Sequence, residues 1–242
     1  MPELRKDVGD RVTIAELLDH TSGLGDFFGD PGYERMRPRL TSLASYLPLI
    51  AEERLQFEPG ARFGYSNSGY VLLGLVVERV SGKSYYSYVA RHVFRPAGMT
   101  ATGCFWKSRR VPNRAVGYEP SGRPDTASLP PRGTSAGGCY STAGDMLRFA
   151  NALFGHRLLS PAMTRTVTTG KVAAPGGRYG YGFGIRGPRS SPTVWHNGGS
   201  PGAGAELDVN PRLGYTVVVL ANVGYPLVAP ALDLVLNALR VP

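Results

Sequence analysis

The sequence predicts an α+β fold in which helices come first and an antiparallel sheet comes last. Helix-start signals recur through residues 13–170, whereas residues 178–242 contain short apolar stretches separated by turns, followed by one amphipathic segment. Helices and strands that are segregated along a chain are typical of α+β architecture rather than of alternating α/β folds. With 242 residues, 42% of them hydrophobic, the chain can bury one core, and we expect a single domain over residues 1–242.

The first expected helix follows a capping box, in which the Thr13 hydroxyl and the Glu16 carboxylate can each bond a backbone amide at the helix start. This pattern predicts a helix over residues 14–20. A second helix is expected over residues 41–53, before Pro59-Gly60. Glycine and proline between these two segments favour a loop.

The apolar run at residues 70–77 is typical of a buried helix, and Gly82 can close it. A tyrosine-rich helix is expected over residues 84–94, with Pro96 as its end. Residues 107–138 are rich in Gly, Pro, Arg and Ser, which predicts a long surface loop.

Two further helix starts complete this mainly helical region. Thr142 is a hydroxyl residue in the N-cap position of a helix that should continue through Leu153. Ser160-Pro161 combines an N-cap residue with proline at the first helical position, where its missing N–H does no harm.

Short strands are expected after residue 178, because aromatic and β-branched residues gather there in runs bounded by turn residues, at 179–185, 193–196, 206–209 and 215–220. The third and fourth strands are joined by a turn at Asn210-Pro211. The last strand is apolar throughout, which is typical of a central strand covered on both faces. From Pro230, polar residues recur at helical spacing, which predicts a C-terminal helix lying on the sheet.

Composition excludes several classes of function. The formal net charge is +9, and 23 of the 27 basic residues are arginines scattered from Arg5 to Arg240. A nucleic-acid-binding protein gathers its charge on one face or helix, so we expect no nucleic-acid partner. Cys104 and Cys139 are far apart and form no Cys-x-x-Cys motif. We interpret them as two free or buried thiols, although spacing alone leaves their pairing open.

Other patterns point to no membrane span, metal or cofactor. No window approaches the roughly 18 unbroken apolar residues of a membrane span, and the first seven residues lack the apolar core of a signal peptide. For the chain as given we therefore expect a cytoplasmic location. The four histidines are dispersed and have no metal-ligand spacing.

Five phrases carry most of the functional information: His-Thr-Ser-Gly-Leu within residues 17–24, Tyr-Ser-Asn-Ser-Gly-Tyr at 65–70, Ser-Ala-Gly-Gly at 135–138, Tyr-Gly-Phe-Gly at 181–184 and His-Asn-Gly-Gly at 196–199. Together and in this order they resemble the β-lactamase-related serine hydrolases. That family includes class C β-lactamases, penicillin-binding-protein-type D-alanyl-D-alanine peptidases and esterases of the same fold. Its full-length members can be periplasmic or secreted. The resemblance implies a β-lactamase/transpeptidase-like fold and a small-molecule or peptide-like acyl substrate.

The resemblance also assigns roles. A serine hydroxyl attacks a carbonyl only when a neighbour removes its proton, and a tyrosine phenol held anionic by nearby cations can do this. The family pattern implies that role for Tyr65. It implies that Asn67 bonds the substrate or the nucleophile's lysine, and that His196 lines the opposite wall of one cleft. Gly198 and Gly199 would let a substrate approach closely, with the Gly199 N–H as half of an oxyanion hole.

The family's Ser-x-x-Lys box has no good match in the chain: three of the four lysines have no serine three residues earlier, and Thr168 to Lys171 matches only loosely and out of order. We therefore expect the family's N-terminal strands and nucleophile helix to be absent, with no acylating serine. The strand at 215–220 would then become an open edge that favours self-association.

Two alternatives remain. One is a non-catalytic module that binds ligands in the remaining cleft. The other is an esterase that uses Ser200, because residues 198–202 fit Gly-x-Ser-x-Gly. That motif requires a strand, a tight turn and a helix, whereas another strand is expected after Ser200. A glycine-rich turn between strands therefore explains the match better.

Overall fold

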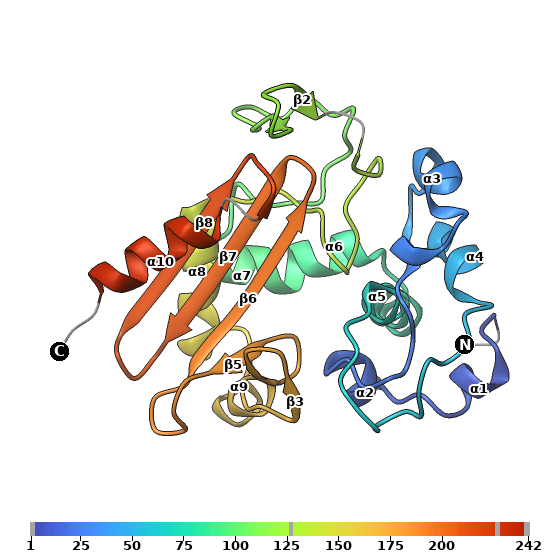
Figure 1. Cartoon of the computed structure of the whole chain (residues 1–242), viewed down its shortest axis with the longest axis horizontal. Helices are drawn as coiled ribbons and strands as arrows, with labels where there is room; N and C mark the ends of the chain where they lie inside the picture. The colour runs from blue at the N-terminus through green and yellow to red at the C-terminus, as the bar shows by residue number, and fades with distance from the viewer. Residues whose placement is uncertain (1–2, 126–127, 226–227, 240–242) are drawn as a thin grey trace.

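A six-stranded antiparallel sheet forms one side of the molecule (Figure 1). The computed structural model describes residues 3–125, 128–225 and 228–239. The strands neighbour each other in chain order: β3 (Val172–Ala174), β4 (Gly177–Tyr179), β5 (Gly184–Arg186), β6 (Thr193–Ser200), β7 (Ala203–Asn210) and β8 (Tyr215–Ala221). Helices precede this sheet along the chain, so the predicted α+β class is confirmed.

The strand expected over residues 179–185 is wrong, because two strands and a turn occupy that stretch. The Gly180 N–H donates to the Phe183 carbonyl at 2.8 Å, and Gly182 has a φ of +86°, a left-handed conformation that favours glycine. The turn therefore separates β4 from β5. β3, which precedes β4, was not predicted from the sequence.

The apolar sequence of the last strand wrongly suggested a central strand, whereas the open edge expected for it agrees with the structure, in which β8 is the edge strand of this sheet. A helix nevertheless packs on each of its faces. α8 (Ala143–Phe154) packs on one face, where Ala150, Leu207 and Val209 form a core cluster. α10 (Ala229–Ala238) packs against β8 on the other face, as expected for the C-terminal helix. The apolar sequence of β8 therefore reflects coverage from both faces and does not specify the strand's place in the sheet.

The remaining helices are α1 (Lys6–Gly9), α2 (Ile14–Leu18), α3 (Tyr33–Met36), α4 (Leu47–Ile50), α5 (Asn67–Ser81), α6 (Tyr85–Val89), α7 (Arg95–Ala97) and α9 (Pro161–Val167). Short 3-10 turns lie at Phe27–Gly29, Arg37–Arg39 and Leu43–Tyr46, and a π-helical turn at Ala90–Phe94 joins α6 to α7. The capping box before α2 is formed in full, as predicted.

The predicted helix over residues 41–53 is wrong in extent. It is replaced by the 3-10 turn Leu43–Tyr46 and the single-turn α4, in which Pro48 lies in the first turn. Proline has no N–H to donate, so a regular α-helix cannot run through this position from upstream. Pro96 likewise lies in the first turn of α7, and the segment ends one residue later than expected, at Ala97 before Gly98.

α5 is the central helix of the helical side. Val71, Leu72 and Leu75 share one face and are buried, together with Leu43 and Tyr46. Gly82 closes the helix with a φ of +65°, as predicted. This packing fixes the N-terminal end of α5, where Tyr65 and Asn67 lie.

A disulfide bond ties the two ends of the long excursion together, so the free-thiol interpretation is wrong. Cys104 and Cys139 are bonded, with their Cα atoms 4.2 Å apart, and the neighbouring Gly103 and Tyr140 form an antiparallel bridge. The chain returns beside itself after 35 residues, which the spacing alone could not indicate. Between the cysteines, the short strands β1 (Gly117–Tyr118) and β2 (Pro124–Asp125) form the hairpin that projects at the top of Figure 1.

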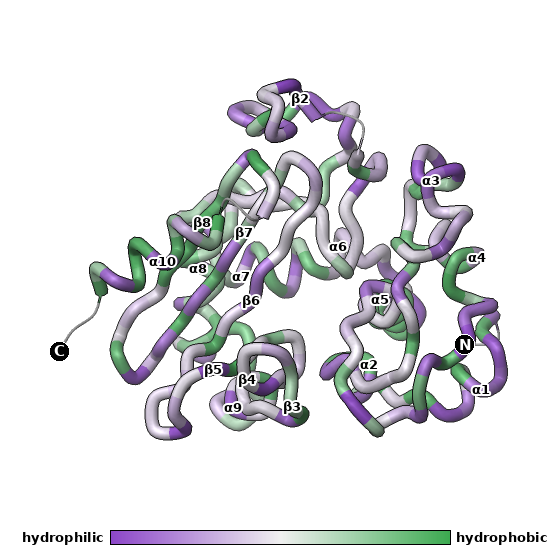
Figure 2. The backbone as a smooth tube through the Cα atoms, in the orientation of Figure 1, coloured by the Kyte–Doolittle hydropathy of each residue, from purple (hydrophilic) through white to green (hydrophobic). Residues whose placement is uncertain are grey.

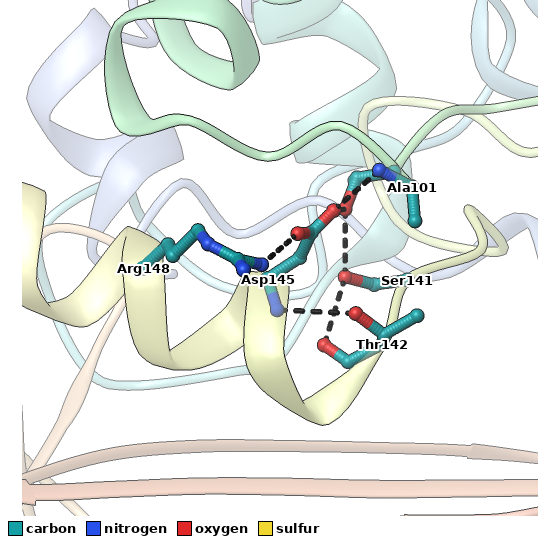
Figure 3. Close-up of polar contacts among 6 residues, drawn as sticks. Ala101, Ser141, Thr142, Asp145 and Arg148 are labelled. Carbon is teal, nitrogen blue, oxygen red and sulfur yellow. Dashed lines mark hydrogen bonds and ion pairs between the residues drawn. The ribbon is translucent and has the colours of Figure 1, made fainter.

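The buried carboxylate of Asp145 secures the same junction (Figure 3). Asp145 accepts hydrogen bonds from the Ala101 N–H at 2.8 Å and from the Thr102 hydroxyl at 2.7 Å, and it pairs with Arg148 at 2.7 Å. Thr142 caps α8 through the Asp145 N–H, as predicted. The start of α8 is therefore joined to the segment that precedes the disulfide.

Candidate active site

The start of α5 positions two of the predicted site residues. Ser66 is the N-cap: its hydroxyl accepts from the Gly69 N–H at 3.0 Å and donates to the Gly25 carbonyl at 2.5 Å. Tyr65 precedes the cap and has an exposed fraction of 47%. Burial of part of its ring raises the pKa of Tyr65, and the nearby Asp26 carboxylate acts in the same direction.

The ring of His20 packs against the ring of Tyr65. The two ring centroids are 4.1 Å apart, and the buried His20 Nδ1 accepts from the Ser66 N–H at 3.1 Å. Nδ1 is therefore unprotonated, and burial lowers the pKa of His20 to about 3, with His196 acting in the same direction. His20 is a neutral support for the residues that lead into α5.

His196 makes two hydrogen bonds that define its proton position. Its Nδ1 lies 2.7 Å from the Asn197 carbonyl, which can only accept, so Nδ1 carries the proton. Nε2 then accepts from the Tyr179 hydroxyl at 2.9 Å. Burial lowers the pKa of His196, which favours the same neutral form.

Contacts between aromatic and histidine rings connect the start of α5 with β6, the two walls of the predicted cleft. The His20 ring is 5.0 Å from Tyr179 between centroids and also touches Tyr65, while Tyr179 bonds His196. The start of α5 and strand β6 therefore meet through His20 and Tyr179. Neither of these two connecting residues was predicted as part of the site.

Asn67 is turned towards Asp26. The Asp26 Oδ2 atom accepts from the Asn67 backbone N–H at 3.0 Å and from its side-chain amide at 2.6 Å. Asp26 also caps the 3-10 turn at Phe27–Gly29. Asp26 was missed in the sequence, where an aspartate in a glycine-rich loop gives only a turn signal.

Strand β6 has a partly open edge. β5 pairs with β6 only through residues 193–195, whereas β7 pairs along the whole strand to Ser200. Beyond Trp195, the edge of β6 that faced β5 has no strand partner among the residues described. The two glycines there have different surroundings. A Cβ at Gly198 would meet nothing within 4 Å, whereas one at Gly199 would lie 2.5 Å from Tyr225 Cβ.

The predicted substrate-binding residues share one open pocket of about 460 Å³. Gly198, Gly199 and Ser200 line it together with Asn197 and residues of three loops: Glu119, Pro120, Pro201, Gly202, Gly224 and Tyr225. Tyr65 and Asn67 do not line it. Ser200 ends β6, its hydroxyl bonds the Pro201 carbonyl at 3.3 Å, and β7 begins at Ala203. The strand-turn-helix geometry of a nucleophile elbow is therefore not formed at Ser200.

Two buried carboxylates lie on the face of β7 opposite to the α8 side. Glu206 and Asp208 have exposed fractions of 2% and 0%, and Arg186 pairs with Asp208. Burial raises the pKa of Glu206 to about 7 and also raises that of Asp208. The alternation of polar and apolar residues in β7 predicts a solvent-facing row here, so the sequence could not reveal this cluster.

Helices packed beside an antiparallel sheet, a Tyr-x-Asn at the start of a buried helix and a His-x-Gly on a neighbouring strand define a β-lactamase/transpeptidase-like domain. The chain belongs to the Beta-lactamase family, whose model matches residues 1–240.

Known proteins agree with this assignment. The chain is 31% identical to penicillin-binding protein 4* of Bacillus subtilis over 211 residues, which cover 79% of this chain and 47% of that protein. The crystal structure of a penicillin-binding protein from Bacillus halodurans has a TM-score of 0.86 and 34% identity, over 97% of this chain and 78% of that one. A D-stereospecific amidohydrolase from Streptomyces sp. has a TM-score of 0.78 and 25% identity, over 90% of this chain and 69% of that one.

The chain thus spans about half the length of the curated relatives that it matches. It is a β-lactamase-fold member of a hydrolase family. In the described part of the chain, no helix is long and apolar enough to cross a membrane.

Proposed function

We propose that this chain forms the acyl-substrate side of a serine hydrolase site that takes an amide, ester or lactam carbonyl. The observation that carries the proposal is the open edge of β6 at residues 196–200, joined through His196, Tyr179 and His20 to Tyr65. An unpaired strand edge can bond an extended acyl substrate, and the open space beside Gly198 leaves room for one.

The raised pKa of Tyr65 makes it a poor general base in this chain. A phenol acts as a general base only when its pKa is lowered by nearby cations, whereas burial and Asp26 raise the pKa of Tyr65 here. The sequence also contains no Ser-x-x-Lys box that would supply both a nucleophile and a cation. We therefore propose that this chain binds acyl ligands and forms no acyl-enzyme by itself.

Binding is tested by NMR titration with N-acetyl-D-alanyl-D-alanine and with benzylpenicillin. We expect the amide signals of Gly198 and Gly199 to shift, and Tyr65→Phe to weaken binding by roughly tenfold or less, the effect of one hydrogen bond. Tyr88→Phe is the matched control, because Tyr88 also stacks on a histidine, His92, at 4.4 Å between centroids. No shift with either ligand contradicts the proposal.

Acylation is tested by intact-protein mass spectrometry. Incubation with a labelled penicillin should leave the mass unchanged, and a stable adduct on any serine contradicts the proposed inactivity. A turnover assay with an activated ester should give no rate above background in the wild type or in Tyr65→Phe. Ester turnover together with labelling of Ser200 by a serine-reactive phosphonate would favour the esterase alternative instead.

A further inference from the structure

Two glycines that face each other across β6 and β7 create a shallow hollow in the sheet. Gly199 and Gly204 are direct cross-strand partners. A Cβ at Gly199 would lie 2.5 Å from Tyr225 Cβ, and one at Gly204 would lie 2.4 Å from Val228 Cγ2. Side chains alternate between the faces of a strand, so this hollow is on the face opposite to His196. Packing against Tyr225 is therefore by itself enough to require glycine at position 199.

The Tyr225 hydroxyl bridges the two strands beside this hollow. It accepts from the Asn197 side-chain amide at 2.8 Å and donates to the Glu206 Oε2 atom at 2.7 Å. The direction is fixed because an amide NH₂ can only donate, which leaves the phenol hydrogen for the carboxylate. Asn197 and Glu206 are themselves cross-strand partners on β6 and β7.

We propose that Tyr225 and Glu206 are positioning residues, which hold residues 197–199 of β6 in place from the face opposite to His196. This inference rests on the proposed function, in which that segment binds the acyl group. Two consecutive glycines make the segment intrinsically flexible, and its other edge has no strand partner in the described structure. The ladder to β7 and the bridge through Tyr225 are therefore what restrain it.

The strength of the hydrogen bond between Tyr225 and Glu206 depends on the charge of Glu206 and therefore on pH. The groups that face Glu206 are the Asp208 carboxylate and the Arg186 guanidinium on the sheet, together with the Tyr225 hydroxyl. Burial raises the pKa of Glu206 to about 7, so the acceptor of the Tyr225 hydrogen bond changes charge near neutral pH. A charged acceptor makes the stronger bond, and Asn197 senses the change through the same hydroxyl.

The test uses NMR on the full ligand-free chain. In the wild type we expect the Asn197 side-chain amide signals to titrate with a midpoint near pH 7. Glu206→Gln and Tyr225→Phe should each abolish that titration. Successive N–H groups of a strand point to opposite edges, so only one of the Gly198 and Gly199 amides faces β7. Tyr225→Phe should also speed hydrogen exchange at that amide by roughly tenfold, the effect of losing one hydrogen bond.

Tyr215→Phe is the matched control, since the Tyr215 hydroxyl also lies at hydrogen-bond distance from a β6 residue, Thr193, but at the other end of the strand. It should leave both readouts unchanged. Absence of the Asn197 titration in the wild type overturns the inference even if Tyr225→Phe fails to fold. Equal exchange of the β7-facing amide in Tyr225→Phe and Tyr215→Phe overturns it as well. Because no ligand is present, these results are separate from failure of the proposed binding.

Discussion

At the scale of single residues, Glu53 couples the stability of the site region to pH. Its side chain is partly buried, and the Ser68 hydroxyl donates to it at 2.9 Å at the start of α5. Burial raises the pKa of Glu53 to about 7, and the carboxylates of Asp26 and Asp30 act in the same direction. The fold therefore favours the protonated form of Glu53.

The sign of the effect follows from this shift. The unfolded chain ionises near the ordinary value of 4.5, whereas the folded chain ionises near 7. Stability gained from Glu53 is therefore present below about pH 4.5 and is lost as the pH rises towards 7 and above. Relative to Glu53→Gln, we expect the wild type to lose on the order of 1–3 kcal/mol of unfolding free energy over that range.

Urea unfolding of both proteins at pH 5, 6, 7 and 8 measures this difference. Glu206 shifts in the same direction but is present in both proteins, so its contribution cancels in the comparison. A constant difference between wild type and Glu53→Gln across these pH values would contradict the prediction.

The sequence identified only part of the candidate site. Tyr65, Asn67 and His196 stand in recognisable motifs, and the motifs could be read one by one. His20 and Tyr179 connect them only because distant segments pack together, and no local pattern records that packing. Glu206 could not be identified for a different reason: it alternates with apolar residues like a solvent-facing strand residue, yet it is buried and bonds the Tyr225 hydroxyl.

At the scale of elements, α5 carries the core of the helical side, and two of its valines differ sharply in burial. Val71 is fully buried, whereas Val80 has an exposed fraction of 83%. Val71→Ala removes two buried methyl groups and leaves a cavity, so we expect a loss of roughly 2–3 kcal/mol of unfolding free energy. Val80→Ala on the same helix should stay within about 0.5 kcal/mol of the wild type.

Chemical denaturation of the two variants provides the comparison. Equal losses would mean that α5 is not packed as described.

The element scale is also where sequence patterns succeed best. The helices that start after Thr13 and Thr142 were predicted because their capping signals are local. α5 was predicted from its apolar run at 70–77, but its cap at Ser66 and its start at Asn67 were not. The segments at 41–53 and 179–185 failed because one proline and one glycine turn divide stretches whose composition looks continuous.

At the scale of the whole molecule, β8 and α10 expose apolar side chains next to the open edge of the sheet. β8 has no strand partner on its outer edge in the described structure and contains no charged residue. Leu220 in β8 is 41% exposed, and Leu234 on α10 is 74% exposed. Figure 2 shows hydrophobic residues along most of α10. An uncharged open edge favours pairing with another strand, as expected from the sequence.

We therefore predict that the isolated chain self-associates at micromolar concentration. Leu220→Lys places a charge on the edge and should lower the apparent mass in light scattering. Val80→Lys adds the same charge on α5, away from the edge, and should have no such effect. A wild-type chain that remains a monodisperse monomer with one cooperative melting transition would contradict this prediction.

The disulfide between Cys104 and Cys139 makes residues 104–139 a closed covalent ring within the chain. The hairpin of β1 and β2, together with Glu119 and Pro120 of the pocket, belongs to that ring. A single proteolytic cut inside it would leave both pieces attached until a reductant is added, so one gel band would become two. In a reducing cytosol such a bond opens, whereas in an oxidising compartment it persists. The covalent closure of the segment that carries this wall of the pocket therefore depends on the redox state of the protein's surroundings.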